Sequence, residues 1–197
     1  GAMNGMAVAR RSSFLIDHLE DDLFAASIRI LDDPHRPRAP RSRPFDGEGL
    51  PTTPRALVDN GRVTGWLLNA ASAKQLELTP TGHASRGSGG SPGISTSNVH
   101  LDKGSMSRDE LIADIGEGVL VNELIGQGVN AITGDYSRGA SGFRIKDGKI
   151  MEPVSDFTVA GNLIDMFASL TPANDLEMYR AINVPTLRID GMTIAGE

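Results

Sequence analysis

Cysteine is absent from the 197 residues of this sequence. The chain therefore has no disulfide, no thiolate ligand for a metal ion and no cysteine nucleophile. Histidine is scarce as well. Its four residues, His18, His35, His83 and His100, never recur in the His-Glu-x-x-His spacing that places two zinc ligands on one face of a helix. From its residues alone, the sequence predicts no recognisable catalytic set.

Long hydrophobic runs and an excess of positive charge are also missing. Hydrophobic residues make up 39% of the chain and aromatic residues 5%, so the core must consist mainly of Leu, Ile, Val and Ala. Because the sequence has neither a signal-peptide pattern nor an apolar run of about 18 residues, we predict a cytoplasmic protein without membrane contact. The formal net charge of −6 argues against non-specific binding of nucleic acid, although it leaves room for a local basic patch.

Proline and glycine, by contrast, are concentrated in a few segments. Six of the eleven prolines lie in residues 34–54, and five arginines run from Arg36 to Arg55, which predicts a surface loop or linker. Residues 79–97 are rich in Gly, Ser and Pro, a composition typical of a flexible linker. The total of 23 glycines favours many short strands over a helical bundle.

The densest glycine segment is residues 126–142, GQGVNAITGDYSRGASG, which has five glycines and lies between apolar, strand-like segments. One interpretation is a set of tight turns or bulges in a sheet, where the backbone needs positive φ or approaches another chain segment closely. The other is a binding surface with exposed main-chain groups, on which Asn130, Asp135, Ser137 and Arg138 are the polar contacts. A phosphate-binding loop is excluded, because no Gly-Lys-Ser/Thr follows and the segment does not open a helix.

Three dipeptides predict β-hairpins, because type I′ turns need positive φ at both central positions. They are Asn60-Gly61, Asp147-Gly148 and Asp190-Gly191, each between short apolar runs. The third hairpin would join residues 186–189 to residues 192–195. Further strands are expected at residues 27–31 and 157–160.

Helical spacing of apolar residues is found in four segments: residues 4–26, 70–78, 108–116 and 163–170. Ser12 or Ser13 is the expected N-cap in the first segment. Ser107, with Glu110 three residues later, predicts a capping box at the start of the third. No repeat of fixed period is present.

His83 is the histidine that we regard as the best functional candidate, because it lies in the Gly/Ser-rich segment TGHASRG together with Arg86. A metal site formed by His83 with Asp46 or Glu48 is one hypothesis for an autonomous metallopeptidase. The alternative for the two acids is a solvated turn.

Several blocks of the sequence resemble the C-terminal part of the TldD/PmbA family, and most closely its PmbA (TldE) branch. In order they are GEGLPTTPRALVDNGRVTGWLLN (47–69), SAKQLELTPTGHASRG (72–87), SNVHLDKG (97–104), GVLVNELIGQGVNAITGDYSRGASGFRIKDGKI (118–150), VSDFTVAGNLIDMF (154–167) and PTLRIDGMTIAG (185–196). The resemblance covers residues 12–196, and its most specific block is GQGVNAITGDYSRGASGF.

The resemblance implies a role in a bacterial metallopeptidase pair. In that family the TldD-type subunit carries zinc on a His-Glu-x-x-x-His helix and a later cysteine, and the TldE-type subunit lacks these ligands. This sequence has neither, so the resemblance implies a non-catalytic subunit that needs no cofactor of its own and binds a TldD-type partner and peptide or unfolded-protein substrates. A different function that it implies is a protein-binding module that modulates DNA gyrase without proteolysis.

Together these observations predict an α+β fold, mainly an antiparallel curved or barrel-like sheet with a few short packed helices. The expected domain is residues 4–197, with residues 4–55 leading into a core of residues 56–197. Gly1-Ala2-Met3 is typical of residues left by tag removal, and the family usually has an additional N-terminal domain, so we expect a part of a longer protein. The expected contact residues are Asn130, Asp135, Ser137 and Arg138, followed by His83 and Arg86. An exposed partner-binding surface also predicts homodimers in isolation.

Overall fold

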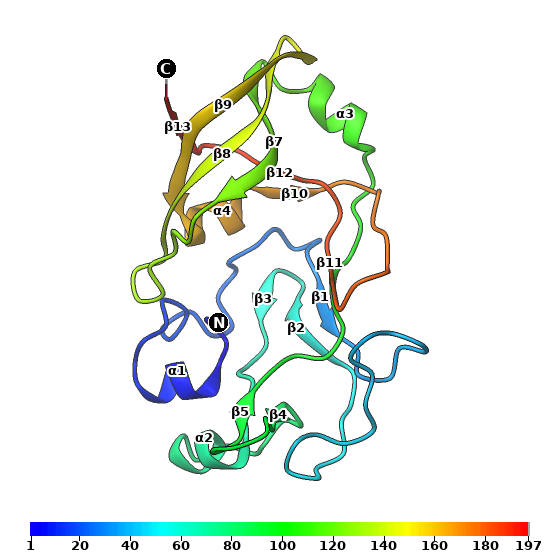
Figure 1. The fold of residues 1–197 in the computed structure, drawn as a ribbon, viewed down its shortest axis with the longest axis vertical. Helices are drawn as coiled ribbons and strands as arrows, with labels where there is room; N and C mark the ends of the chain where they lie inside the picture. The colour runs from blue at the N-terminus through cyan, green and yellow to red at the C-terminus, as the bar shows by residue number, and fades with distance from the viewer. Residues whose placement is uncertain (197) are drawn as a thin grey trace. The chain divides into compact units, whose positions relative to one another are not determined.

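The computed structural model describes residues 1–196, and the chain divides into two compact units (Figure 1). The first unit comprises Gly1–Asp102 and Glu177–Val184, and the second comprises Lys103–Leu176 and Pro185–Glu197. Glu197, the last residue of the predicted domain, lies outside the described residues. Each unit contains its own main sheet.

A five-stranded sheet forms the centre of the first unit, in the order β11-β6-β1-β2-β3. Neighbouring strands are antiparallel except β11 and β6, which run parallel. Leu57, Val58, Val63 and Leu101 of this sheet are buried. The elements of the unit are α1 (Gly5–Ala9), β1 (Ile30–Asp32), β2 (Arg55–Asp59), β3 (Arg62–Val63), α2 (Ala70–Gln75), β4 (Ala84–Ser85), β5 (Gly93–Ile94), β6 (Val99–Leu101) and β11 (Ile182–Asn183).

The second unit is built on a four-stranded antiparallel sheet in the order β13-β9-β8-β7, whose long strands dominate this part of Figure 1. Ala140, Phe157 and Val159 form its buried cluster. The elements of the unit are α3 (Arg108–Ala113), β7 (Glu117–Ile125), β8 (Asp135–Lys146), β9 (Lys149–Asn162), α4 (Leu163–Ala168), β10 (Leu170–Pro172), β12 (Leu187–Ile189) and β13 (Thr193–Ala195). The predicted α+β class with mainly antiparallel strands is confirmed, and within residues 1–196 the sheets remain open and form no closed barrel.

Two of the three predicted hairpins are confirmed. Asn60 and Gly61 have φ of 48° and 79° and join β2 to β3, and Asp147 and Gly148 have φ of 48° and 73° and join β8 to β9. Positive φ at both central residues is the type I′ geometry that matches the twist of the flanking strands. These turns are therefore determined by local backbone sterics.

The third predicted hairpin, across Asp190-Gly191, is wrong. In this dipeptide only Gly191 has positive φ, at 79°, so the turn redirects the chain instead of folding it back on itself. As a result β12 pairs with β10, and β13 pairs with β9. Each of the two strands thus pairs with a strand distant in sequence.

The predicted helix over residues 4–26 is reduced to α1, which spans five residues. Its N-cap is Asn4, whose side chain accepts a hydrogen bond from the Met6 amide at 2.9 Å, so the prediction of Ser12 or Ser13 is wrong. Arg11 has a φ of 55°, a left-handed conformation that cannot continue a helix. Of the apolar residues that follow, Leu15, Leu23 and Phe24 are buried outside any helix, whereas Leu19 is 40% exposed. The periodic pattern therefore predicted burial in part and did not predict the helix boundaries.

Other elements begin or end at residues that differ from the predicted ones. The predicted strand over residues 27–31 begins later, as β1, and the expected strand over residues 157–160 is the end of the much longer β9. Residues 79–97 contain β4 and β5, which pair with each other, so this segment has regular structure where a flexible linker was expected. Met3 belongs to the three residues that are typical of tag removal, and it contacts the fold: its carbonyl accepts a hydrogen bond from the Leu67 amide at 2.9 Å. Over residues 1–196, none of the helices combines the length and apolar content needed to cross a bilayer.

Candidate functional site

The predicted site residues belong to different units. Asn130, Asp135, Ser137 and Arg138 lie in the second unit, at or beside the loop between β7 and β8. His83 and Arg86 lie in the first unit, close to β4. The structure therefore presents two polar clusters, one in each unit.

In the second unit, Asn130 organises the loop of residues 126–134, which we call the glycine loop. Its side-chain oxygen accepts hydrogen bonds from the amides of Ile132 (3.0 Å) and Thr133 (3.3 Å), and its own amide donates to the Asp135 carbonyl at 2.8 Å. Asparagine commonly closes turns in this way because its short side chain mimics a main-chain acceptor. The side chain of Asn130 thus shapes the loop from within.

Asp135 connects the glycine loop to the beginning of α4. Its carboxylate accepts hydrogen bonds from the Thr133 hydroxyl at 2.6 Å and from the Asn162 side-chain amide at 3.2 Å. These two bonds, that from Thr133 first, lower the pKa of Asp135 below its usual value. Asn162 in turn caps α4 by accepting a hydrogen bond from the Ile164 amide at 3.0 Å.

Arg138 secures the other side of the loop, because its guanidinium donates to the Leu124 carbonyl at the end of β7 at 2.9 Å. Its buried Nε has no hydrogen-bond partner among the described residues. Ser137 donates its amide to the Gly128 carbonyl at 2.7 Å, and its side chain is exposed. Of the four predicted contact residues, Asn130, Asp135 and Arg138 therefore already hold the loop in shape.

Four of the five glycines of residues 126–142 meet the requirements of turns and bulges, and Gly139 does not. A Cβ on Gly128 would overlap the Ser137 carbonyl oxygen, and one on Gly142 would overlap the Leu120 carbonyl oxygen. Gly142 also lies at an irregularity in the pairing of β8. Gly126 and Gly134 have φ of 78° and 81°, which glycine adopts without strain.

The edge strands of this sheet are β7, which is nine residues long, and β13, which is three residues long. β8, which carries Gly139 and Gly142, is an inner strand between β7 and β9, so these two glycines do not lie at a sheet edge. Among the described residues β7 pairs with β8 alone. Sequence reasoning also missed the apolar residues beside this edge, although the runs ELI and VNAI around the glycines carried that signal. The exposed ones are Leu124, Ile125, Val129 and Ile132, the last at 63% exposure.

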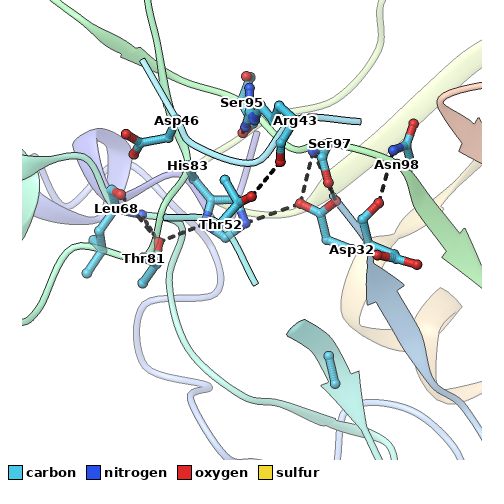
Figure 2. Close-up of polar contacts among 12 residues, drawn as sticks. Asp32, Arg43, Asp46, Thr52, Leu68, Thr81, His83, Ser95, Ser97 and Asn98 are labelled. Atoms are coloured by element: carbon cyan, nitrogen blue, oxygen red, sulfur yellow. Dashed lines mark hydrogen bonds and ion pairs between the residues drawn. The ribbon is translucent and has the colours of Figure 1, made fainter. Parts of the chain in front are cut away.

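In the first unit, His83 is a buried residue of a polar network (Figure 2). Its Nδ1 lies 2.8 Å from the Thr81 hydroxyl, and its Nε2 lies 3.1 Å from a carboxylate oxygen of Asp32. Asp32 is 2% exposed and also accepts hydrogen bonds from the Ser97 amide, at 3.0 Å, and from the Ser97 hydroxyl. Burial raises the pKa of Asp32, but the hydrogen bonds from His83 and Ser97 outweigh it, so the pKa is lowered overall.

Asp32, His83 and Thr81 have the carboxylate–imidazole–hydroxyl order found in some hydrolases. Here the Thr81 hydroxyl also accepts the Leu68 amide at 2.8 Å, so it is held against the main chain on its other side (Figure 2). The whole residue His83 is 4% exposed. The arrangement joins β1 to two loops that are distant in sequence, and this is the role that its geometry supports.

The hypothesis of a metal site formed by His83 with Asp46 or Glu48 is not supported by the contacts of these side chains. Asp46 accepts hydrogen bonds from the amides of Leu50 (3.0 Å) and Ala84 (3.1 Å), and Glu48 accepts one from the Ala70 amide at 2.8 Å. Within residues 1–196, no group of three or more His, Cys, Asp or Glu side chains is placed to hold a metal ion. The described residues thus do not fit a zinc site.

Arg86, the last of the predicted residues, is exposed and donates to the Gly47 carbonyl at 3.3 Å. Sequence reasoning missed Asp32 and Asn98, which are among the most deeply buried polar side chains in the unit. Only their position at the ends of short strands could have drawn attention to them.

Comparison with known proteins gives the same family for sequence and fold. Residues 1–196 match the PmbA/TldA metallopeptidase C-terminal domain. The chain is 40% identical to the metalloprotease PmbA of Escherichia coli O157:H7 and 39% identical to its homologue from Haemophilus influenzae, covering 100% and 99% of this chain and 42% of each relative. The chain therefore spans less than half the length of the curated relatives that it matches.

Solved structures agree. A proposed modulator of DNA gyrase from Bacteroides thetaiotaomicron superposes with a TM-score of 0.88 at 31% identity, over 100% of this chain and 43% of that one. TldE from Thermococcus kodakarensis superposes with a TM-score of 0.87 at 25% identity, over 99% of this chain and 46% of that one. The chain belongs to the PmbA/TldA metallopeptidase family and corresponds to its C-terminal domain.

Proposed function

We propose that this chain is the substrate- or partner-binding part of a non-catalytic, TldE-type subunit, which works with a zinc-carrying TldD-type subunit on peptides or unfolded proteins. Membership of a metallopeptidase family and similarity to TldE support this proposal. The described residues do not fit a zinc site. In this proposal zinc and its chemistry belong to the partner subunit.

The observation that carries the proposal is the unpaired edge of β7. This strand is nine residues long, and in the described part of the chain its second edge faces no other strand. An exposed edge offers a row of main-chain donors and acceptors, to which an extended peptide can add as a further strand. Such binding depends little on sequence, which suits a protein that handles unfolded chains.

The glycine loop extends this edge with an ordered apolar surface. Ile125 and Ile132 are 55% and 63% exposed, while Asn130 and Asp135 hold the loop through four side-chain hydrogen bonds. Because the loop is already ordered, binding loses less conformational entropy. The predicted residues Asn130, Asp135 and Arg138 then act as supports of the contact surface, and Ser137 is exposed beside it.

The test is complex formation with the TldD-type subunit of the same organism, followed by size-exclusion chromatography with light scattering and a peptidase assay. A double variant, Ile125→Asp/Ile132→Asp, places charge on the proposed surface. Ile194→Asp, on β13 at the opposite edge of the sheet and 46% exposed, is the matched control. We expect the double variant to lose the complex or the peptidase activity and the control to keep both.

Equal behaviour of the two variants would exclude the β7 edge as the contact surface. The same chromatography of the chain alone tests the prediction of homodimers, and a monomer at all concentrations would contradict it. A second candidate function, modulation of DNA gyrase without proteolysis, is favoured only by the name of a structural relative. Co-elution with gyrase subunits, together with no complex with the TldD-type subunit, would support that function.

A further inference from the structure

The proline- and arginine-rich segment of the first unit is an ordered loop with uncompensated positive charge. We call residues 34–45, PHRPRAPRSRPF, the arginine loop. It contains four arginines, Arg36, Arg38, Arg41 and Arg43, and no acidic residue between Asp33 and Asp46. The whole chain has a net charge of −6, so this loop is a positively charged segment of a negatively charged protein.

A buried asparagine holds the arginine loop in place. Asn98 is 0% exposed, and its side-chain amide donates to the Asp33 carbonyl and to the Ser42 hydroxyl, both at 3.0 Å. Its side-chain oxygen accepts the Arg41 amide at 3.0 Å, and the Arg43 amide donates to the Pro34 carbonyl at 2.9 Å (Figure 2 shows Asn98 and Arg43). The loop is therefore closed across its base and tied to the sheet through one residue.

The four guanidinium groups form no ion pair with any acid in residues 1–196. Arg36 and Arg43 donate to main-chain carbonyls, those of Arg180 at 2.8 Å and Ser95 at 3.1 Å. The side chains of Arg38 and Arg41 are exposed and have no hydrogen bond within the described chain. Elsewhere in the same unit, Arg29 and Arg62 are paired with Asp59 and Asp22.

The backbone of the arginine loop also contains a residue with positive φ. Arg38 has a φ of 57°, a left-handed conformation that a residue with a side chain seldom adopts. A loop held by hydrogen bonds that presents the exposed guanidinium groups of Arg38 and Arg41 is organised for an anionic ligand before the ligand arrives.

We propose that the arginine loop is a docking site for an acidic peptide segment. Guanidinium groups bind carboxylates through paired, charge-assisted hydrogen bonds, which fits Asp- or Glu-rich chains. Phe45, directly after Pro44, is 61% exposed and offers an apolar contact beside the charges. The choice of a peptide as the ligand rests on the proposed function, whereas the site itself rests on the first unit alone.

Charge favours a peptide over nucleic acid. A duplex engages proteins through many phosphates along an extended surface, whereas the arginine loop offers four arginines on a molecule with a net charge of −6. Over distances longer than the Debye length of about 8 Å the surrounding acids are screened, so a short peptide meets mainly the local positive charge. A longer polyanion would meet the acidic remainder of the surface.

The experiment is fluorescence anisotropy of a labelled, unstructured, glutamate-rich peptide with the wild-type protein. The comparison peptide has glutamine in place of each glutamate. We expect the glutamate peptide to bind at least tenfold more tightly, and its affinity to fall as salt rises from about 50 to about 200 mM. Arg38→Gln/Arg41→Gln should weaken binding by about tenfold or more, because two charge-assisted contacts are lost.

The matched control is Arg10→Gln/Arg11→Gln, which removes the same charge from two exposed arginines of the same unit. It should change the affinity by no more than about twofold. Undetectable or equal binding of the two peptides, equal effects of the two double variants, or tighter binding of duplex DNA would each overturn the proposal. If the peptide proposal fails but the complex with the TldD-type subunit forms, the proposed function still stands. If that complex does not form but the glutamate peptide binds as expected, the arginine loop remains a peptide site and the proposed function is excluded.

Discussion

The two polar clusters of this protein use the same side-chain chemistry under opposite conditions of exposure. In the first unit, Asp32 binds His83 and Ser97 with 2% of its surface exposed. In the second unit, Asp135 binds Thr133 and Asn162 on an exposed loop. Both carboxylates accept two or more hydrogen bonds, and both have a lowered pKa.

The difference lies in what replaces a lost hydrogen bond. Around Asp135 water can take over, so the loop depends on its side chains for shape more than for stability. Around Asp32 no water replaces a missing partner, so each group in the network needs the others. We infer that the first cluster stabilises the fold and that the second prepares a surface for contact.

The largest effect is expected from Asp32→Ala. It leaves His83 and the Ser97 amide without their buried acceptor, which should lower the free energy of unfolding by about 3 kcal/mol or more. Denaturant unfolding measures this loss. Asp135→Ala is the matched variant and should have a much smaller effect, and an equal loss in both variants would contradict the distinction between the clusters.

A smaller loss of unfolding free energy is expected from Gly128→Ala. The stability of the glycine loop depends more on the close backbone packing at Gly128 than on the carboxylate of Asp135. The new Cβ would overlap the Ser137 carbonyl oxygen, so the loop must move away from β8 at a cost of about 1–3 kcal/mol. Gly116→Ala, in the same unit, places a Cβ in open space and serves as the control in thermal unfolding. Similar midpoints for the two variants would show that the loop yields easily.

The same comparison of buried and exposed polar groups applies to the N-caps of two helices. Asn69 caps α2 from a site that is 1% exposed, and Ser107 caps α3 from a partly exposed site, each within a capping box. Asn69→Ala should cost about 2 kcal/mol and Ser107→Ala about 0.5–1 kcal/mol, because only the second helix end is open to water. The two variants can be compared by chemical denaturation, and the reverse order would argue against burial as the cause.

The smallest effect concerns pH. The pKa of Asp32 is lower in the folded protein than in the unfolded chain, where it is about 3.9, so the unfolded state binds more protons as the pH falls. The stabilisation is complete above the unfolded value and is lost as the pH falls towards the folded one. We expect unfolding free energy to decline below about pH 5, and to decline less steeply in Asp32→Asn. Parallel curves for the two proteins would exclude Asp32 as the source.

Local patterns predicted those features that a few neighbouring residues decide. Asn60-Gly61 and Asp147-Gly148 form their turns because both positions accept positive φ, and Ser107 with Glu110 forms its capping box within one turn of helix. Asp190-Gly191 has the same composition and forms no hairpin, because the strands around it pair with β10 and β9. Identical dipeptides thus have different outcomes when long-range pairing competes.

Sequence reasoning about the candidate site had the same limit. It selected the glycine loop and its polar residues, but it could not determine that Asn130, Asp135 and Arg138 form hydrogen bonds that hold the loop, nor that β7 is an edge strand. It selected His83 for its Gly/Ser surroundings, whereas the partner that buries it, Asp32, lies far away in sequence.

By itself, the sequence determined the family, the α+β class, the type I′ turns and the absence of a cysteine site, because these depend on composition and on neighbouring residues. The tertiary structure alone decided which polar side chains are buried, which strands lie at the edges of the sheets and which arginines remain unpaired. Those properties depend on contacts between residues far apart in the chain, such as Asn98 with Arg41 or Asp32 with His83. No local pattern encodes such contacts, because each forms only when the complete set of strands has packed.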